Sequence, residues 1–334
     1  MKPEPWWIDL IKALLIINLV MVAFAYMTWL ERKLLGRMQE RYGPNRAGPF
    51  GLLQPIADLV KLLRKEHFFP EAAINILYIG MPALAGVTAL ASFAVIPWGP
   101  GWDIGGYFVG GWVLDAPISL ILLFALGSLG IYAFMVGGWA SESKYSLLGS
   151  MRTCAQMVSY EVSLAMSVLG VVLMGQSLSL VDIVHKQQTT EWFIGPQIVG
   201  LLVFFIAGIA ETNRPPFDLP EAETELVAGY HTEYSGMRWG LFQAAEYINM
   251  LTLSGLCVTL FFDGYHFPWV HSLDVLGPLW FVLKLFTLVS VFIWLRATQP
   301  RLRYDQLMRF GWKVLLPVAT ANALVTAFLV VLIK

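Results

Sequence analysis

Charged residues are scarce in this chain of 334 residues. Asp, Glu, Lys and Arg make up only 13% of it, about half of the roughly 25% that is typical of soluble domains. The 22 basic and 23 acidic residues leave a net charge of −1, so we expect no nucleic-acid partner. A share of 57% hydrophobic residues excludes a disordered chain and is too apolar for a single soluble core. What remains is an integral membrane protein.

Motifs for nucleotide, zinc and iron–sulfur sites are absent as well. There is no G-x-x-x-x-G-K-[ST], no G-x-G-x-x-G and no H-E-x-x-H in the sequence. The two cysteines, Cys154 and Cys257, are too few for an iron–sulfur cluster, which takes about four cysteine ligands. We see neither a repeat nor a linker. Residues 1–334 are therefore expected to form one polytopic membrane domain that binds no metal or redox cofactor of its own.

Long apolar runs dominate the chain instead. A bilayer core about 30 Å thick is spanned by about 20 apolar residues of helix. Eight segments approach this length, and none has the strict alternation of a barrel strand. We predict an all-α integral membrane protein with eight transmembrane helices, at 13–30, 76–96, 118–136, 155–174, 198–213, 241–262, 276–295 and 314–333.

The basic residues predict how these helices are oriented. The segments after the first, third, fifth and seventh predicted spans hold 17 of the 22 Lys and Arg residues, and the opposite side holds four. Because basic residues are retained on the cytoplasmic side of a membrane, these four segments should form large cytoplasmic loops. Both termini should then face outward.

The first cytoplasmic loop contains a candidate amphipathic helix. Within residues 52–66, Asp58, Lys61 and Lys65 fall on one helical face, opposite a broad apolar face. This pattern is typical of a helix that lies in the membrane interface. Two interpretations remain: an ordinary surface helix with a solvated charged face, or a helix that lines an access path at the membrane surface.

The third cytoplasmic loop is rich in acids. Three prolines exclude a continuous helix there, and Arg214 is the one basic residue among the acids, which are Glu211, Asp218, Glu221, Glu223, Glu225 and Glu233. Runs of like charge are usually solvated, but apolar residues are interleaved with these acids. We therefore expect a packed, partly buried acidic cluster, in which Glu221, Glu223 and Glu225 repel one another.

Ionisable residues also fall inside the predicted spans. Glu161, Glu211 and Glu246 lie within or at the inner end of three successive spans, and Lys284 lies near the middle of the seventh. A charge in a membrane helix costs about 2.5–3.5 kcal/mol on insertion scales. Such residues are either buried polar groups bonded to a neighbouring helix, with Lys284 as a counter-charge, or members of a proton route. Three carboxyls leading to an acidic loop favour the proton route.

Several motifs resemble the family of the H-type subunit of respiratory complex I, which is the NADH dehydrogenase subunit 1 family. They are ERKLLGRMQERYGPNRAGP (31–49), GWAS (138–141), KYSLLG (144–149), ETNRPPFDLPEAETE (211–225), EYSG (233–236) and RYDQLM (303–308). The resemblance covers nearly the whole chain. It implies a membrane-arm subunit of a proton-translocating NADH:quinone oxidoreductase in the bacterial cytoplasmic membrane.

The resemblance also implies partners and roles for individual residues. Quinone would enter from the bilayer into a chamber shared with peripheral subunits, FMN and iron–sulfur clusters would lie in partner subunits, and further membrane-arm subunits would flank the chain. Arg32, Arg37, Arg46, Asp58 and Lys61 would line the quinone passage. The acids Asp218, Glu221, Glu223, Glu225 and Glu233 would form a loop over the chamber, and the proton route would contain Glu161, Glu211, Glu246 and Lys284.

Two departures and two alternatives accompany this resemblance. Some members of the family carry an acid in the third span near Ser128, where this chain has none, and Glu142 stands where members commonly have Asn. The chain is alternatively the equivalent subunit of a membrane-bound hydrogenase or of another donor-driven relative. A stand-alone ion transporter is the other alternative, although such a protein should show internal repeats and broken helices.

Overall fold

The computed structural model describes residues 5–105, 107–189, 192–219, 223–267 and 276–333. The described residues are mostly helical. The helices are α1 (Trp6–Met38), α2 (Gln54–Arg64), α3 (Asn75–Ala94), α4 (Ser119–Ala140), α5 (Lys144–Gly175), α6 (Leu180–Thr189), α7 (Ile198–Glu211), α8 (Glu223–Leu226), α9 (Gly236–Phe261), α10 (Gly277–Thr298), α11 (Tyr304–Phe310) and α12 (Leu316–Ile333). Short 3-10 segments, η1 (Pro49–Gly51) and η2 (Gly229–His231), and a π-helical segment, η4 (Gly311–Leu315), join them.

All eight predicted spans fall on helices. Seven helical segments among the described residues are long and apolar enough to cross a membrane, with α11, η4 and α12 counted as one. The eighth, α7, has 14 residues and is only about 21 Å long. It ends at Glu211 because Pro215 and Pro216 follow shortly and lack the N–H groups that a helix needs.

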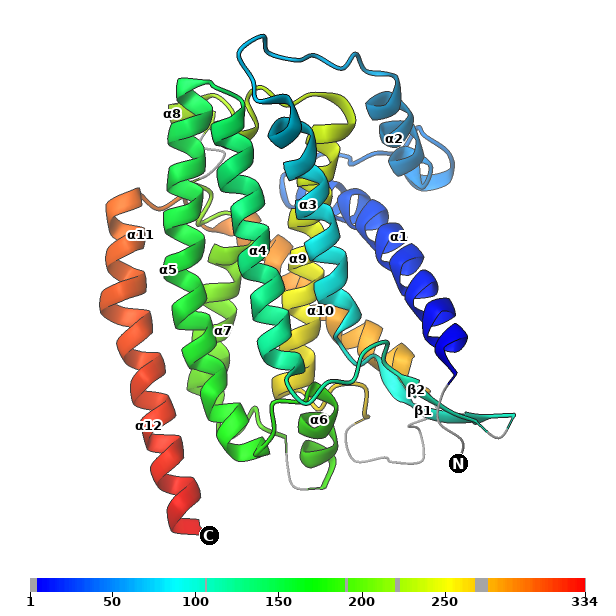
Figure 1. The fold of residues 1–334 in the computed structure, drawn as a ribbon, viewed down its shortest axis with the longest axis vertical. Coiled ribbons are helices and arrows are strands. Elements are labelled where there is room, and N and C mark those ends of the chain that lie inside the picture. Colours follow the sequence, from blue (N-terminus) through cyan, green and yellow to red (C-terminus); the bar gives the residue numbers. More distant parts are fainter. Residues whose placement is uncertain (1–4, 106, 190–191, 220–222, 268–275, 334) are drawn as a thin grey trace.

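The helices form a bundle around α9 (Figure 1). Nearly every residue in the second half of α9 is buried, with α3, α7 and α10 packed against it. On one flank α12 packs along α5. On the other, α1 leans away from α3, and α2 lies beside its far end (Figure 1). This leaves α1 with much of its apolar surface exposed, including Leu10, Leu14 and Leu19.

The two ends of the bundle carry different structures. The start of α1 and the end of α12 lie at the same end, together with α6 and the hairpin (Figure 1). The hairpin pairs β1 (Gly99–Ile104) with β2 (Tyr107–Gly111) in antiparallel register, so the all-α prediction missed two short strands. Lys12 of α1 donates hydrogen bonds to the backbone oxygens of Gly110 and Trp112. The hairpin therefore anchors the start of α1.

Candidate functional site

A cluster of four charged residues, of which three are buried and Arg296 is half-buried, lies where α1, α9, α10 and the segment after α7 meet. We call Glu31, Arg214, Glu246 and Arg296 the central charge cluster. Arg214 Nη1 lies 3.9 Å from Glu31 Oε1, and Arg214 Nη2 lies 3.9 Å from Glu246 Oε2. Arg296 forms an ion pair with Glu31. Glu31 and Glu246 are each 3% exposed and Arg214 is 8% exposed.

Two tyrosines complete the central charge cluster. Tyr247 donates a hydrogen bond of 2.6 Å to Glu31, and Tyr230 donates one of 2.8 Å to Glu246. The guanidinium carbon of Arg214 lies 4.1 Å from the centre of the Tyr247 ring. Two acids are thus matched by two arginines, which offsets the desolvation of the buried charges. Glu246, a predicted member of the proton route, is enclosed within this cluster.

A glycine contact brings Tyr230 into this position. An added Cβ at Gly149 of α5 would lie only 2.6 Å from the backbone of Gly229 and Tyr230. The absence of a side chain at Gly149 therefore lets η2 pack directly on α5. From there the Tyr230 side chain, which is fully buried, reaches Glu246 on α9.

Two further carboxyls face one turn of α4. Ser128 Oγ of α4 donates a hydrogen bond to Glu161 of α5. A Cβ built on the neighbouring Gly127 would lie 3.6 Å from Glu211 Oε1 at the end of α7, and the buried Glu211 Oε2 makes no hydrogen bond within the described residues. The turn of α4 that lacks an acid in this chain is thus the turn that both carboxyls approach.

Lys284 lies away from these acids. Its ammonium group donates hydrogen bonds to the backbone oxygens of Phe262, Gly264 and His266, at 2.7, 2.9 and 2.7 Å. These residues follow the end of α9, and Phe262 is 16 positions beyond Glu246, or about 24 Å of helix. The sequence predicts a position near the middle of the seventh span, either on the proton route or as a counter-charge. In the structure the ammonium group contacts the backbone that follows the end of α9.

Two of the predicted quinone-passage residues form an ion pair between α1 and α2. Arg32 of α1 forms an ion pair of 2.7 Å with Asp58 of α2, which ties the two helices together. The other three predicted residues are exposed: Arg37 on α1, Arg46 in the connecting segment and Lys61 on α2. The apolar residues of α2 are exposed too, namely Ile56, Leu59, Val60 and Leu63.

The acidic loop is only partly the cluster that was expected. Glu225 is exposed and pairs with Arg152 of α5 at 2.5 Å, and this hydrogen bond holds the pKa of the Glu225 carboxyl below its ordinary value. Repulsion among neighbouring acids therefore does not dominate at Glu225. Asp218 and Glu233 are half-buried. Glu221 lies outside the described residues, and Glu223 is described only as the first residue of α8.

Four members of this site went unrecognised in the sequence. Glu31 and Arg296 were assigned to loops because charges end an apolar run, but α1 continues to Met38 and α10 to Thr298. Tyr230 and Tyr247 carry no charge, and aromatic residues are common throughout the chain. Glu31 and Arg296 each stand directly after a long apolar run. An acid and a base at the same depth in the membrane can pair, so this position could have indicated their contact.

Comparison with known proteins identifies the family. The family described as NADH dehydrogenase matches residues 11–327. The chain belongs to the family of H-type subunits of NADH-quinone oxidoreductase. It is 50% identical to the second H-type subunit of Syntrophobacter fumaroxidans over 94% of the chain and 93% of the relative. It is 49% identical to the first H-type subunit of Geobacter metallireducens over 97% of each chain.

A third relative of this family is subunit 8 of the Thermus thermophilus NADH-quinone oxidoreductase, 48% identical over 98% of this chain and 88% of the relative. As a member of this family, the chain is a multi-pass membrane subunit of an NADH-quinone oxidoreductase, respiratory complex I. The family assignment favours this enzyme over the hydrogenase alternative and the stand-alone transporter.

Proposed function

We propose that this chain forms the membrane side of the quinone chamber and couples quinone reduction to proton translocation. The central charge cluster carries the proposal. It joins α1 and α10 to the start of the acidic loop, and it brings acids, arginines and tyrosine hydroxyls together around the buried Glu31 and Glu246. Such groups respond to a change of charge nearby because their interactions are poorly screened by water. Electrons reach the quinone from FMN and iron–sulfur clusters in the partner subunits.

Quinone reaches the chamber past α2. In this proposal α2 lies in the membrane interface, with its exposed apolar residues toward the lipid. Arg32 and Asp58 hold it against α1, and the Cδ1 methyl of Leu62 lies 3.1 Å from the position of a Cβ built on Gly240 of α9. The exposed α1 and α2 and the start of α9 then border the passage, with Arg37, Arg46 and Lys61 near its mouth.

Separating α2 from α1 should impair quinone reduction alone. Arg32→Met removes the ion pair with Asp58, and an exposed pair of this kind contributes up to about 1 kcal/mol. We expect the apparent KM for a short-chain quinone to rise up to about fivefold. NADH:ferricyanide reductase activity should stay unchanged, because that reaction ends in the peripheral subunits. Lys144→Met, at an exposed position at the start of α5, is the control. Equal KM values for the two variants would rule out the proposed passage.

The proton route uses the carboxyls around α4. One proton moves from Glu211 through water to Ser128 Oγ while the proton of Ser128 passes to the Glu161 carboxylate. The serine is unchanged, and its hydroxyl takes the place of the absent acid. Glu246 joins the route through Tyr230 and the central charge cluster. We assign Lys284 to the anchoring of α9, and Asp218, Glu221, Glu223, Glu225 and Glu233 to a loop over the chamber.

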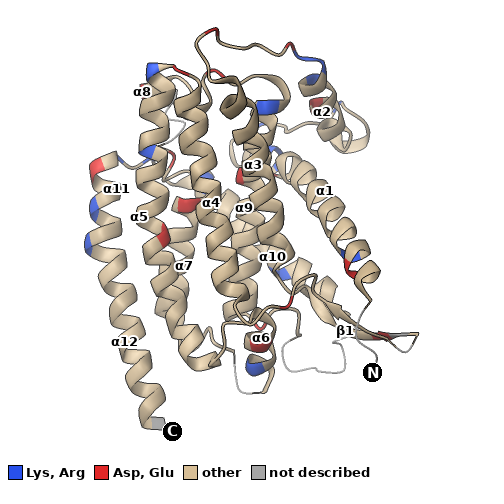
Figure 2. Ribbon diagram, in the orientation of Figure 1, with Lys and Arg blue, Asp and Glu red and all other residues tan. Residues whose placement is uncertain are grey.

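The whole chain forms one unit of eight crossings in the cytoplasmic membrane. We propose that α7 crosses despite its length, because Glu211 lies in the interior next to α4 and the segment after it continues inward. Figure 2 shows the end of the bundle that carries α2 and the start of α5 with several basic residues. That end is therefore the cytoplasmic one.

This orientation predicts the position of the C-terminus. A phosphatase reporter fused after Lys334 should be active, because this enzyme needs the oxidising exterior. The same reporter inserted at Glu142, in the exposed turn between α4 and α5, should be inactive. The reverse pattern would show that the orientation is wrong, and activity at both positions would show that the number of crossings between them is even.

A further inference from the structure

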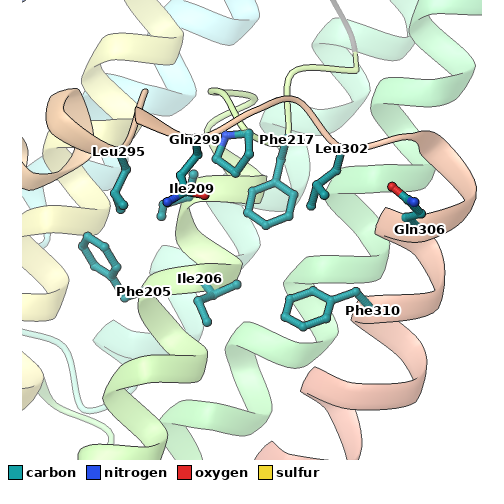
Figure 3. A pocket seen from close by; sticks show the side chains of 10 residues that line it. Phe205, Ile206, Ile209, Phe217, Leu295, Gln299, Leu302, Gln306 and Phe310 are labelled. Carbon is teal, nitrogen blue, oxygen red and sulfur yellow. The ribbon is translucent and has the colours of Figure 1, made fainter. Parts of the chain in front are cut away.

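A cavity of about 670 Å³ lies outside the proposed quinone passage and proton route, on the flank of the bundle between α7, α10 and α11. Figure 3 shows Phe205 and Ile206 of α7 in the space between Leu295 of α10 and Phe310. Phe217 and Leu302 close the cavity above, from the segments that follow α7 and α10. The lining is apolar apart from Gln299 and Gln306.

The cavity continues along the membrane-facing surface of α7. Ile198 and Leu202 are 56% and 58% exposed. They lie on the same helical face as Phe205 and Ile209, because spacings of three and four residues return to one face. The exposed strip therefore runs from the start of α7 to the cavity. An extended apolar chain that lies along α7 fits this groove.

Exposed charged and aromatic side chains neighbour the lining residues of α10 and α11 in the sequence. Arg309 and Lys313 are exposed on either side of Phe310, and Arg303 is exposed and paired with Asp305. Asp305 is the one acid among residues 295–316, against five basic residues. Trp294, Tyr304 and Trp312 are exposed as well. Exposed Trp and Tyr are typical of the boundary between headgroups and acyl chains.

From this arrangement we propose that the cavity binds an anionic phospholipid. One acyl chain lies along α7 and ends beneath Phe217 and Leu302. The phosphate pairs with Arg309 and Lys313, and the amides of Gln299 and Gln306 donate to the ester oxygens. In the orientation proposed above this lipid belongs to the cytoplasmic leaflet. A transmembrane helix of another subunit would not use the surplus of positive charge at the mouth.

The proposal is tested on the intact complex, exchanged into vesicles that contain phosphatidylcholine and phosphatidylglycerol. Lipid that stays bound after detergent extraction is counted by mass spectrometry. Ile206→Trp fills the cavity, and we expect it to lose one tightly held phosphatidylglycerol. The matched control, Ile121→Trp, makes the same substitution at a 51% exposed position of α4, outside the cavity lining and the α7 groove, and should retain this lipid. Equal retention in the two variants would overturn the proposal.

The headgroup is tested separately on exposed residues, which removes any effect on folding. Arg309→Gln combined with Lys313→Gln should reduce the preference for phosphatidylglycerol over phosphatidylcholine by about fivefold for each cation. Lys144→Gln should leave the preference unchanged. A wild-type complex that retains both lipids equally contradicts the proposal. So does a photoreactive residue at Phe310 that crosslinks to another subunit and not to lipid.

Discussion

Replacing both Glu161 and Glu211 by glutamine should uncouple the complex. Glutamine keeps the size and hydrogen-bonding capacity of the side chain and removes the titratable proton. A positioned proton-transfer group typically contributes at least about a hundredfold to the rate of the transfer that it serves. We expect NADH-driven proton pumping, measured in vesicles as protons moved per NADH oxidised, to fall to a small fraction of the wild-type ratio. Assembly and NADH:ferricyanide activity should remain.

The serine between these acids supplies a second measurement. Ser128→Ala removes the hydroxyl that contacts Glu161 and should lower the pumping ratio in the same direction as the double variant. Ser290→Ala is the control, because the Ser290 hydroxyl donates only to the backbone oxygen of Phe286 in its own helix. Normal pumping by an assembled Glu161→Gln, Glu211→Gln complex would show that both acids are buried structural groups.

The sequence predicted the helices well because each is determined locally. A run of about 20 apolar residues in lipid must satisfy its own backbone hydrogen bonds, and a helix does so without any partner. The hairpin at residues 99–111 and the π-helical segment at 311–315 were missed. In the π-helical segment, Gly311 lies against the Tyr160 ring, and Tyr160 donates a hydrogen bond to the backbone oxygen of Leu307. Contacts between distant segments of this kind leave no periodic pattern in the sequence.

In the candidate site, too, the sequence predicts the local features and misses the contacts between distant segments. The sequence alone identifies Glu161, Glu211 and Glu246 as candidate functional residues, because carboxyls are rare in apolar runs. Their partners do not follow, because Glu246 meets Tyr230 and Arg214 through the packing of α5, η2 and the segment after α7. Lys284 shows the limit most clearly. An intramembrane lysine indicates a buried partner, but it does not reveal that three backbone oxygens accept its hydrogen bonds.

Arg214 should be the most sensitive single position in the central charge cluster. Arg214→Met leaves Glu31 with Arg296 and Tyr247 and deprives Glu246 of its arginine. Removing one partner from a buried ion pair typically costs about 3–5 kcal/mol, a large part of the stability of a folded domain. We expect little assembled complex at the growth temperature, measured as the yield of purified complex, and a short half-life on heating. Lys144→Met should resemble the wild type.

A second substitution separates charge from packing. If Arg214 mainly neutralises Glu246, then Arg214→Met combined with Glu246→Gln should assemble better than Arg214→Met alone, since the unpaired carboxylate is gone and Tyr230 still has an oxygen to which it donates. The two substitutions should therefore be strongly non-additive, as expected of residues in one network. The yield of assembled complex for Arg214→Lys should fall between those of the wild type and of Arg214→Met. A single ammonium cannot reach Glu31 and Glu246 together as the planar guanidinium does. Strict additivity of the two substitutions would mean that Arg214 acts through its packing on the Tyr247 ring and not through its charge.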